Sequence, residues 1–280
     1  MANIAWLGTG LLGAGFVKAA LKRGDSVRVW NRTASKAKAL EALGAVACAT
    51  PAEAATGVER VHLCLSDDSA VDGVIAELGP FGGPIIDHTT VTPRGAAARA
   101  KRLPGRYLAC PVFMGPAMAE QSSGRMLCAG DAALVEALSP ALEKMTGELQ
   151  VFGNDVTVPA TLKLLGNSMI IGITGVLSDA LAVAQGGGVE IKDAIAFLQN
   201  FQIGNIVNMR GVRMAAGDYA ASFELSMARK DVRLMQETAA PRAMATLDGL
   251  GARMDALIAH GHGSKDLGAL AIEIVPPAAK

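Results

Sequence analysis

An amine and an amide stand four residues apart where a long apolar segment opens at Pro159: they are Lys163 and Asn167. Residues at this spacing lie on one face of a helix, a turn apart. An ammonium there can stabilise negative charge on a carbonyl oxygen and donate a proton to it. Burial on an apolar helix would favour the neutral amine that the oxidising direction needs. We therefore predict that Lys163 and Asn167 form the catalytic pair.

A glycine-rich motif near the N-terminus carries the second chemical pattern. The apolar run from Asn3 to Leu7 ends in Gly-Thr-Gly-Leu-Leu-Gly, and a helical pattern follows at once. In a strand–turn–helix context, these glycines permit a tight turn, close approach to a pyrophosphate and packing of helix on strand. The helix N-terminus then supplies an anion site. The residues expected to bind a dinucleotide here are Gly8, Thr9, Gly10, Leu11, Leu12 and Gly13.

The end of the second predicted strand, Ser26–Trp30, indicates which dinucleotide is bound. An NAD-selective site usually has an acidic residue there, about 20 residues past the glycines. This chain has Asn31, Arg32 and Thr33 instead. Arg32 can pair with a 2′-phosphate and Thr33 can donate a hydrogen bond to it. We expect NADP(H) as cofactor; the alternative is that Arg32 is a solvated turn residue and the site takes either cofactor.

Two further strand ends should border the same ligand, because ligands in such sheets lie beyond the carboxyl ends of the strands. A strand that starts at Arg60 enters a turn after Leu65, and the strand at 85–87 continues into a hydroxyl-rich segment. We expect the ribose or nicotinamide to be contacted by Leu65, Ser66, Val71 and Thr90. His88 could be a general acid, but a histidine in this position is more often a structural hydrogen-bonding group.

Strands and helices alternate as far as Phe152, and from Pro159 the pattern is helical. We predict an α/β fold with two domains. Residues 1–158 should form a Rossmann-like dinucleotide-binding domain with a parallel-rich sheet. Residues 159–280 should form a long connecting helix and an all-α C-terminal domain for substrate binding and dimerisation, with one helix from Pro241 to Ala259.

The connecting helix contains an apolar stretch, 162–183, that is long enough to span a bilayer of ordinary thickness. Lys163, Asn167 and Asp179 interrupt it, and charged groups are costly in lipid. We therefore expect a helix that is buried inside a soluble protein.

Charge and cysteine content narrow the classes of partner. The 26 basic and 26 acidic residues balance, so no long-range field attracts nucleic acid or an anionic membrane. The four cysteines are widely spaced, which argues against a zinc site or a disulfide framework. The N-terminus lacks the basic start of an export signal. We expect a cytoplasmic protein without a metal site that acts on a small molecule.

Together these motifs resemble the β-hydroxyacid dehydrogenases, the group that contains 3-hydroxyisobutyrate dehydrogenase and tartronate semialdehyde reductase. The resemblance covers the whole chain and rests on five motifs in order: the glycine turn, the segment 87–93, the Lys163 and Asn167 pair, the segment 230–232 and the segment 261–266. It implies a homodimer or homotetramer. It also implies that Lys163 is the catalytic lysine, that Asn167 positions the substrate and that Thr90 contacts the cofactor. By the same resemblance Lys230, with Asp231 beside it, lies near cofactor and substrate.

One motif departs from that family. Members that act on small hydroxyacids typically have Pro-Val-Ser-Gly-Gly, whose hydroxyl and amides bind the carboxylate, whereas this chain has Pro-Val followed by Phe113, Met114 and Gly115. The exchange removes a hydroxyl and adds apolar bulk to the wall that faces the substrate. The substrate is then larger, more apolar, or an acid held by Lys230 or a different group.

These observations predict an NADP(H)-dependent oxidoreductase that transfers hydride between nicotinamide and the carbonyl or alcohol carbon of a small hydroxyacid or semialdehyde, with Lys163 as proton donor or acceptor. An imine reductase or reductive aminase is the first alternative; the apolar Phe113 and Met114 favour it, but such enzymes usually lack the lysine. A non-catalytic, cofactor-bound scaffold or sensor is the second. The sequence leaves the substrate and the direction of the reaction open.

Overall fold

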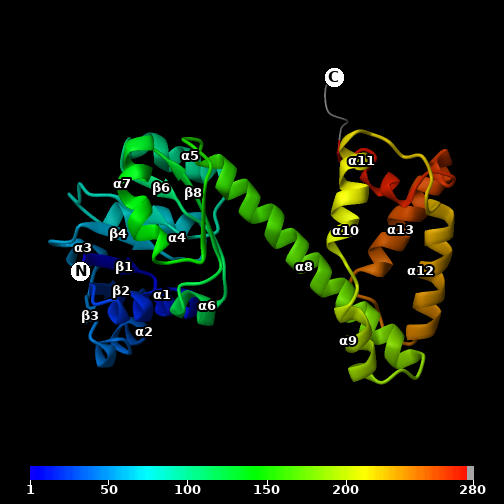
Figure 1. Ribbon diagram of the computed structural model, residues 1–280, viewed down its shortest axis with the longest axis horizontal. Helices are drawn as coiled ribbons and strands as arrows, with labels where there is room; N and C mark the ends of the chain where they lie inside the picture. The colour runs from blue at the N-terminus through cyan, green and yellow to red at the C-terminus, as the bar shows by residue number, and fades with distance from the viewer. Residues whose placement is uncertain (276–280) are drawn as a thin grey trace. The chain divides into compact units, whose positions relative to one another are not determined.

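The computed structural model describes residues 1–275, and the chain divides into two compact units between Asn167 and Ser168 (Figure 1). The division falls inside one continuous helix, α8 (Thr157–Gly186), rather than before its first turn. The first unit is α/β and the second is helical. The predicted class, a Rossmann-like domain followed by a long helix and a helical region, is confirmed.

Nine strands form the sheet of the first unit within the described residues. Their order across the sheet is β3-β2-β1-β4-β5-β6-β8-β7, with β9 beside β8. The strands from β3 to β6 are parallel, and β8 is antiparallel to β6. The order runs outward from β1 in both directions, so the crevice for a ligand lies where β1 and β4 end. The strands are β1 (Asn3–Leu7), β2 (Ser26–Trp30), β3 (Val46–Ala47), β4 (Arg60–Leu63), β5 (Ile85–Asp87), β6 (Tyr107–Ala109), β7 (Val112–Phe113), β8 (Arg125–Gly130) and β9 (Glu148–Val151).

Helices cover both faces of this sheet (Figure 1), and the central strand β1 shows why. Ile4 and Trp6 belong to one apolar cluster, while Ala5 and Leu7 belong to another. Because successive side chains of a strand point to opposite faces, a strand that is apolar throughout needs cover on both. The helical segments of this unit are α1 (Leu11–Lys22), α2 (Ala34–Lys38), the turn η1 (Glu41–Leu43), α3 (Pro51–Ala55), α4 (Asp68–Glu77), α5 (Pro93–Arg102), α6 (Pro116–Glu120) and α7 (Ala132–Glu143).

The second unit packs its helices around a small core. Leu225 and Val232 of one helix meet Met254 and Leu257 of another, and Figure 1 shows these two helices, α12 and α13, side by side. The helical segments of this unit after α8 are α9 (Ile191–Gln199), α10 (Gly204–Ile206), η2 (Val207–Gly211), α11 (Val212–Ala215), α12 (Leu225–Ala239), α13 (Leu247–Leu257), η3 (Ile258–His262) and η4 (Leu267–Ala271).

The helix predicted from Pro241 to Ala259 begins later, at Leu247. Asp179 of α8, almost wholly buried, explains the difference: its carboxylate accepts hydrogen bonds from the amides of Ala245, Thr246 and Leu247 at 2.6–2.9 Å. A carboxylate at the first amides of a helix satisfies groups that have no partner within the helix. Asp179 therefore fixes the start of α13, and this role accounts for a charge inside an apolar helix.

The prediction that α8 is buried within the protein is wrong. Only 6% of its most apolar 18-residue stretch is buried, and in the described chain it is the one helix that is long and apolar enough to cross a membrane. Ile170 and Ile171 are 56% and 71% exposed. A sequence pattern shows that a helix is apolar, but it does not show which surface covers it.

Stacked rings fill the core on one face of the sheet. Trp6 stacks with Phe16 and with the buried His62, with ring centroids 4.9 and 4.7 Å away, and His88 stacks 5.3 Å from Trp6. The rings are joined by hydrogen bonds at their edges. Arg60 Nε donates to His62 Nε2 at 3.1 Å, and His62 Nδ1 lies 3.0 Å from His88 Nε2.

These hydrogen bonds define which ring nitrogen of each histidine carries the hydrogen. A guanidinium only donates, so His62 Nε2 accepts and its Nδ1 carries the hydrogen that goes to His88 Nε2. His88 Nδ1 then donates to the carbonyl oxygen of Cys110 at 2.9 Å. Burial lowers the pKa of His88 to about 4, and burial, followed by the charges of His88 and Arg60, holds the pKa of His62 well below its usual value. His88 is thus a structural residue and not a general acid.

We expect stability to decline on acidification for this reason. Between the unfolded pKa of 6.5 and the folded value of about 4 the unfolded chain binds more protons, so His88 alone removes about 3 kcal/mol of unfolding free energy as the pH falls through that window. Urea unfolding between pH 7.5 and 4.5, followed by fluorescence of Trp6 and Trp30, measures it. His88→Gln should flatten the profile, whereas the exposed control His260→Gln should keep it. A profile unchanged in His88→Gln contradicts the assignment.

Candidate dinucleotide-binding and active site

The glycine turn after β1 is shaped by close approach of backbone to backbone. Gly8 has φ +100°, and its amide donates to the carbonyl of Trp30 at 2.9 Å. A Cβ on Gly8 would lie 2.2 Å from the carbonyl oxygen of Cys64, and a Cβ on Gly13 would lie 2.0 Å from that of Gly8. Glycine is therefore required at both positions, and the turn brings the ends of β1, β2 and β4 together.

Asn31 ties the end of β2 to this turn. Its side-chain oxygen accepts from the amide of Thr9 at 3.0 Å, and its side-chain nitrogen donates to the carbonyl of Thr33 at 3.0 Å. Both polar atoms are thus used within the protein. Asn31 shapes the rim of the site, and this contact fixes where Arg32 and Thr33 leave the strand.

A cavity of about 720 Å³ opens beyond these strand ends. It is lined by most of the residues predicted to bind the dinucleotide and by several that the sequence argument missed. The predicted residues in its lining are Gly8, Gly10, Leu11, Leu12, Gly13, Asn31, Arg32, Thr33, Leu65 and Ser66. The missed residues include Trp30, Lys36, Cys64, Asp67 and Ser69.

Four residues predicted to bind the cofactor are absent from this lining: Thr9, Val71, Thr90 and Lys230. Val71 of α4 points into the core and is fully buried. Ala70, Gly73 and Val74 of the same helix line the cavity instead. Helix periodicity explains this, because consecutive residues of a helix point in different directions. Thr90 follows Thr89 in the loop after β5 and is half-buried.

The chemistry of the turn fits a dinucleotide. A Cβ on Gly10 would meet no atom within 4 Å, so this face of the turn is open to a ligand. Helix α1, 12 residues long, has no side-chain cap at its N-terminus, which leaves its first amides for an anion. Within the described chain the hydroxyl of Thr9 is buried and has no hydrogen-bond partner. A pyrophosphate would satisfy these groups.

The ribose end of the cavity carries mixed charge. Arg32, just before α2, and Lys36, within it, supply two cations four residues apart, and Asp67 supplies a carboxylate. The carboxylate of Asp67 accepts from the amide of Ala70 at 2.9 Å and so caps α4. The pKa of Asp67 is lowered chiefly by this backbone hydrogen bond. A hydrogen bond from Ser66 and, least, the charge of Arg32 lower it further. Lys36 is a basic residue one turn past Arg32, and this spacing could have identified it.

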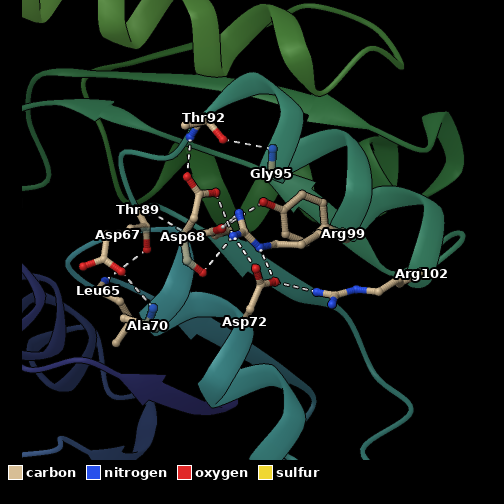
Figure 2. Close-up of polar contacts among 12 residues, drawn as sticks. Leu65, Asp67, Asp68, Ala70, Asp72, Thr89, Thr92, Gly95, Arg99 and Arg102 are labelled. Carbon is tan, nitrogen blue, oxygen red and sulfur yellow. Dashed lines mark hydrogen bonds and ion pairs between the residues drawn. The ribbon is translucent and has the colours of Figure 1, made fainter.

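A buried arginine holds the loops that border the cavity (Figure 2). The Arg99 side chain is fully buried; its Nη2 donates to Asp68 Oδ1 at 2.8 Å and its Nε donates to Asp72 Oδ1 at 3.0 Å. Its Nη1 lies 3.9 Å from Asp87 Oδ2, which also accepts from Tyr107 Oη at 2.8 Å. One guanidinium therefore faces three carboxylates.

The same network joins the ends of β4 and β5, as the dashed lines in Figure 2 show. Asp68 Oδ2 accepts from the amide of Thr92 at 2.9 Å, and Thr92 in turn caps α5. Thr89 Oγ1 accepts from the amide of Leu65 at 3.0 Å. Burial would lower the pKa of Arg99, but the hydrogen bonds that it donates to Asp72 and Asp68 raise it above its usual value. Arg99 stays charged and keeps the two loops together.

The predicted catalytic lysine is half-buried at the start of α8. Lys163 Nζ lies 4.2 Å from the centroid of the Phe113 ring, and burial lowers its pKa. Asn167 is half-buried one turn further along the same helix. Met114 packs against the ring-filled core, and Gly115 precedes α6. In the first unit the structure thus brings together Lys163 and Phe113.

Lys230 and Asp231 belong to the second unit. Both lie on α12, where Lys230 Nζ and Asp231 Oδ1 form an ion pair of 3.1 Å between partly exposed side chains. At such exposure the pair contributes little to stability.

Comparison with known proteins identifies the family. Residues 3–153, more than half of the chain, match the NAD-binding domain of 6-phosphogluconate dehydrogenase. The chain belongs to this family. The match covers the glycine turn and the residues that line the cavity. It confirms the predicted resemblance to the β-hydroxyacid dehydrogenases.

The relatives of this chain include a protein named as a nuclear factor and one named as a reductase. The human cytokine-like nuclear factor N-PAC is 29% identical over 246 residues, which cover 83% of this chain and 44% of that protein. The chain thus spans less than half the length of this relative. Glyoxylate/succinic semialdehyde reductase 1 of Arabidopsis thaliana is 29% identical over 242 residues, 83% of each chain.

A solved structure supports the fold over nearly the full length. The reductive aminase of Aspergillus terreus, in complex with NADPH and ethyl-5-oxohexanoate, superposes with a TM-score of 0.86 at 22% identity. The similarity covers 98% of this chain and 99% of that one. At this identity the likeness shows the fold alone.

We predict that Arg99→Leu destabilises the first unit by about 3–5 kcal/mol, because it leaves Asp87 buried without its cation. Arg102→Ala is the matched control. Arg102 binds the same Asp72 from an exposed position, so its loss should cost less than about 1 kcal/mol. Urea unfolding followed by tryptophan fluorescence compares the two. Equal effects of both substitutions would show that burial of Arg99 does not matter.

Proposed function

We propose that this chain is an NADP(H)-dependent oxidoreductase that interconverts a carbonyl and an alcohol on a small molecule. The observation that carries the proposal is the half-buried Lys163, whose pKa is lowered by burial alone, in a chain with a built dinucleotide site. The nicotinamide, when bound, supplies or accepts the hydride. Lys163 donates the proton to the carbonyl oxygen in reduction and accepts it in oxidation. Asn167 positions the substrate oxygen.

Three groups of residues hold the cofactor in this proposal. The glycine turn and the amides of α1 bind the pyrophosphate. Arg32, Thr33 and Lys36 bind the 2′-phosphate, since a guanidinium and an ammonium both suit that anion. Leu65, Ser66 and Thr90 border the nicotinamide half.

We propose a semialdehyde or oxo acid as substrate, in keeping with the name of the Arabidopsis relative. An imine is the second candidate. It is favoured by the ring of Phe113 beside the lysine and by the shared fold with a reductive aminase. A cofactor-bound scaffold is the third, since N-PAC is named as a nuclear factor and not as an enzyme. We place the chain in the cytoplasm.

We expect NADPH oxidation with a panel of glyoxylate, succinic semialdehyde, and methylmalonate and tartronate semialdehydes. Lys163→Ala should lower kcat by about 10²- to 10⁴-fold on the best of these, because it removes the proton donor. Lys101→Ala, an exposed lysine of α5, is the control and should act as wild type. Turnover of a cyclic imine alone, or activity that survives Lys163→Ala, contradicts the lysine mechanism.

Cofactor preference has a separate test. Arg32→Ala should raise the KM for NADPH by about 10- to 100-fold, as expected for the loss of a charged hydrogen bond, and should leave the KM for NADH unchanged. Lys38→Ala, on helix α2 just after Arg32 but outside the cavity lining, should change neither constant. An equal loss with both cofactors would show that Arg32 does not bind the 2′-phosphate.

We further propose that the chain works as a homodimer built on the exposed face of α8. A groove of about 700 Å³ in the second unit is lined almost wholly by apolar side chains of α8, α9 and α10, among them Met169, Ile173, Leu177, Leu198 and Ile206. An apolar surface of this kind needs cover in a soluble protein. A second copy offers the same face and so can complete it symmetrically.

Sedimentation equilibrium should give twice the chain mass of 28.7 kDa. Ile173→Asp places a charge in this groove, where Ile173 is 37% exposed, and should yield monomers at micromolar concentration. Leu43→Asp is the control, because Leu43 is 52% exposed and belongs to the first unit, whereas the groove belongs to the second. A chain that is monomeric as wild type, or that is recovered only from membranes, contradicts the dimer.

A further inference from the structure

The ring of Phe113 occupies a fixed position under the lysine. Phe113 ends the short strand β7, which pairs with β8 so that Phe113 stands opposite Arg125. This strand pairing therefore fixes the position of the Phe113 backbone, from which the ring extends. Lys163 Nζ sits over the ring face at 4.2 Å from its centroid, within the range at which a cation is attracted to an aromatic face.

The helix is shaped to receive this ring. A Cβ added to Gly166 would lie 2.4 Å from Cζ and 2.5 Å from Cε1 of Phe113. Atoms cannot approach so closely, so a side chain at 166 and the ring cannot both keep their places. Gly166 follows Lys163 by three residues and shares its face of α8. The ring thus packs against the bare backbone at 166 while its face meets the ammonium at 163.

We propose that Phe113 is the positioning residue for Lys163, an inference that rests on the proposed function. The ring of Phe113 holds the ammonium in place for proton transfer. The absence of a side chain at Gly166 leaves room for the ring.

Two opposing effects act on the lysine in this arrangement. Burial removes water from the ammonium and favours the neutral amine. The ring face favours the cation. Burial is the one cause that lowers the pKa of Lys163, and no charged side chain contributes to the shift. The charged groups beside Phe113 are Arg125 and Glu148, and they bind each other at 2.9 Å. The ring of Phe113, rather than a carboxylate, therefore favours the protonated form of Lys163 that reduction needs.

The test is the pKa of Lys163 in Phe113→Leu, which keeps apolar bulk and removes the ring. Competitive labelling with acetic anhydride across pH, with mass spectrometry of the Lys163 peptide, measures it without catalysis. We expect a fall of about 0.5–1.5 pH units. The alkaline limb of kcat/KM for reduction and the acid limb for oxidation should move down by the same amount. Phe81→Leu, the same change at a ring packed in the other core cluster, should shift neither.

Gly166→Ala provides an independent variant. Alanine is a better helix former than glycine, so a weakened helix cannot explain its effect. The added methyl should displace the ring and lower the labelling pKa of Lys163 in the same direction. Thermal unfolding of each variant verifies that it is folded.

A labelling pKa that is the same in wild type, Phe113→Leu and Gly166→Ala overturns the proposal. So does an equal shift in Phe81→Leu. These outcomes differ from failure of the proposed function, which is read from activity that survives Lys163→Ala. If Lys163→Ala is inactive and Phe113→Leu leaves both pH limbs in place, the lysine is the proton donor but Phe113 does not position it.

Discussion

The buried guanidinium of Arg99 is the interaction on which the cavity depends. Asp68 and Asp72 belong to helix α4 and Asp87 ends strand β5, and without a cation their charges would repel one another. With Arg99 between them, the loop after β4 and the loop after β5 are held in register. The glycine turn then packs against the carbonyl of Cys64 at the end of the same β4. The cavity therefore relies on a charge that is not part of its own lining.

The parts of the fold that depend on local pattern could be predicted. A strand, a glycine turn and a helix in immediate succession specify one geometry, so the turn from Gly8 to Gly13 could be predicted from spacing alone. The parallel-rich sheet follows from the same alternation of strands and helices. Lys163 and Asn167 share a face because a helix has a fixed period. In each case the determining interactions lie within a few residues of one another.

What depends on distant contacts could not be predicted. Asp68 and Asp72 look like the solvated face of a helix, and Arg99 looks like one more basic residue of α5; their meeting is decided by packing across 27 to 31 positions of sequence. Val71 fell on the wrong side of α4 because a strand end does not fix the rotation of the helix after it. The apolar stripe of α8 indicated a buried helix, yet the second unit uses Asp179 to start α13 and leaves that stripe exposed. Phe113 read as a lost carboxylate site, whereas in the fold its ring faces the lysine.

The most direct test of the account is a pair of isotope effects on kcat/KM for the best carbonyl substrate. NADPH deuterated at the transferred position is compared with ordinary NADPH, in H2O and in D2O, for wild type and Lys163→Ala. The account predicts that wild type slows with either deuterium, and that the residual activity of Lys163→Ala keeps the effect of deuterated NADPH but loses that of D2O, because the lysine no longer transfers the proton. A wild-type rate indifferent to deuterated NADPH would contradict hydride transfer, and the same D2O effect in both proteins would contradict the role of Lys163.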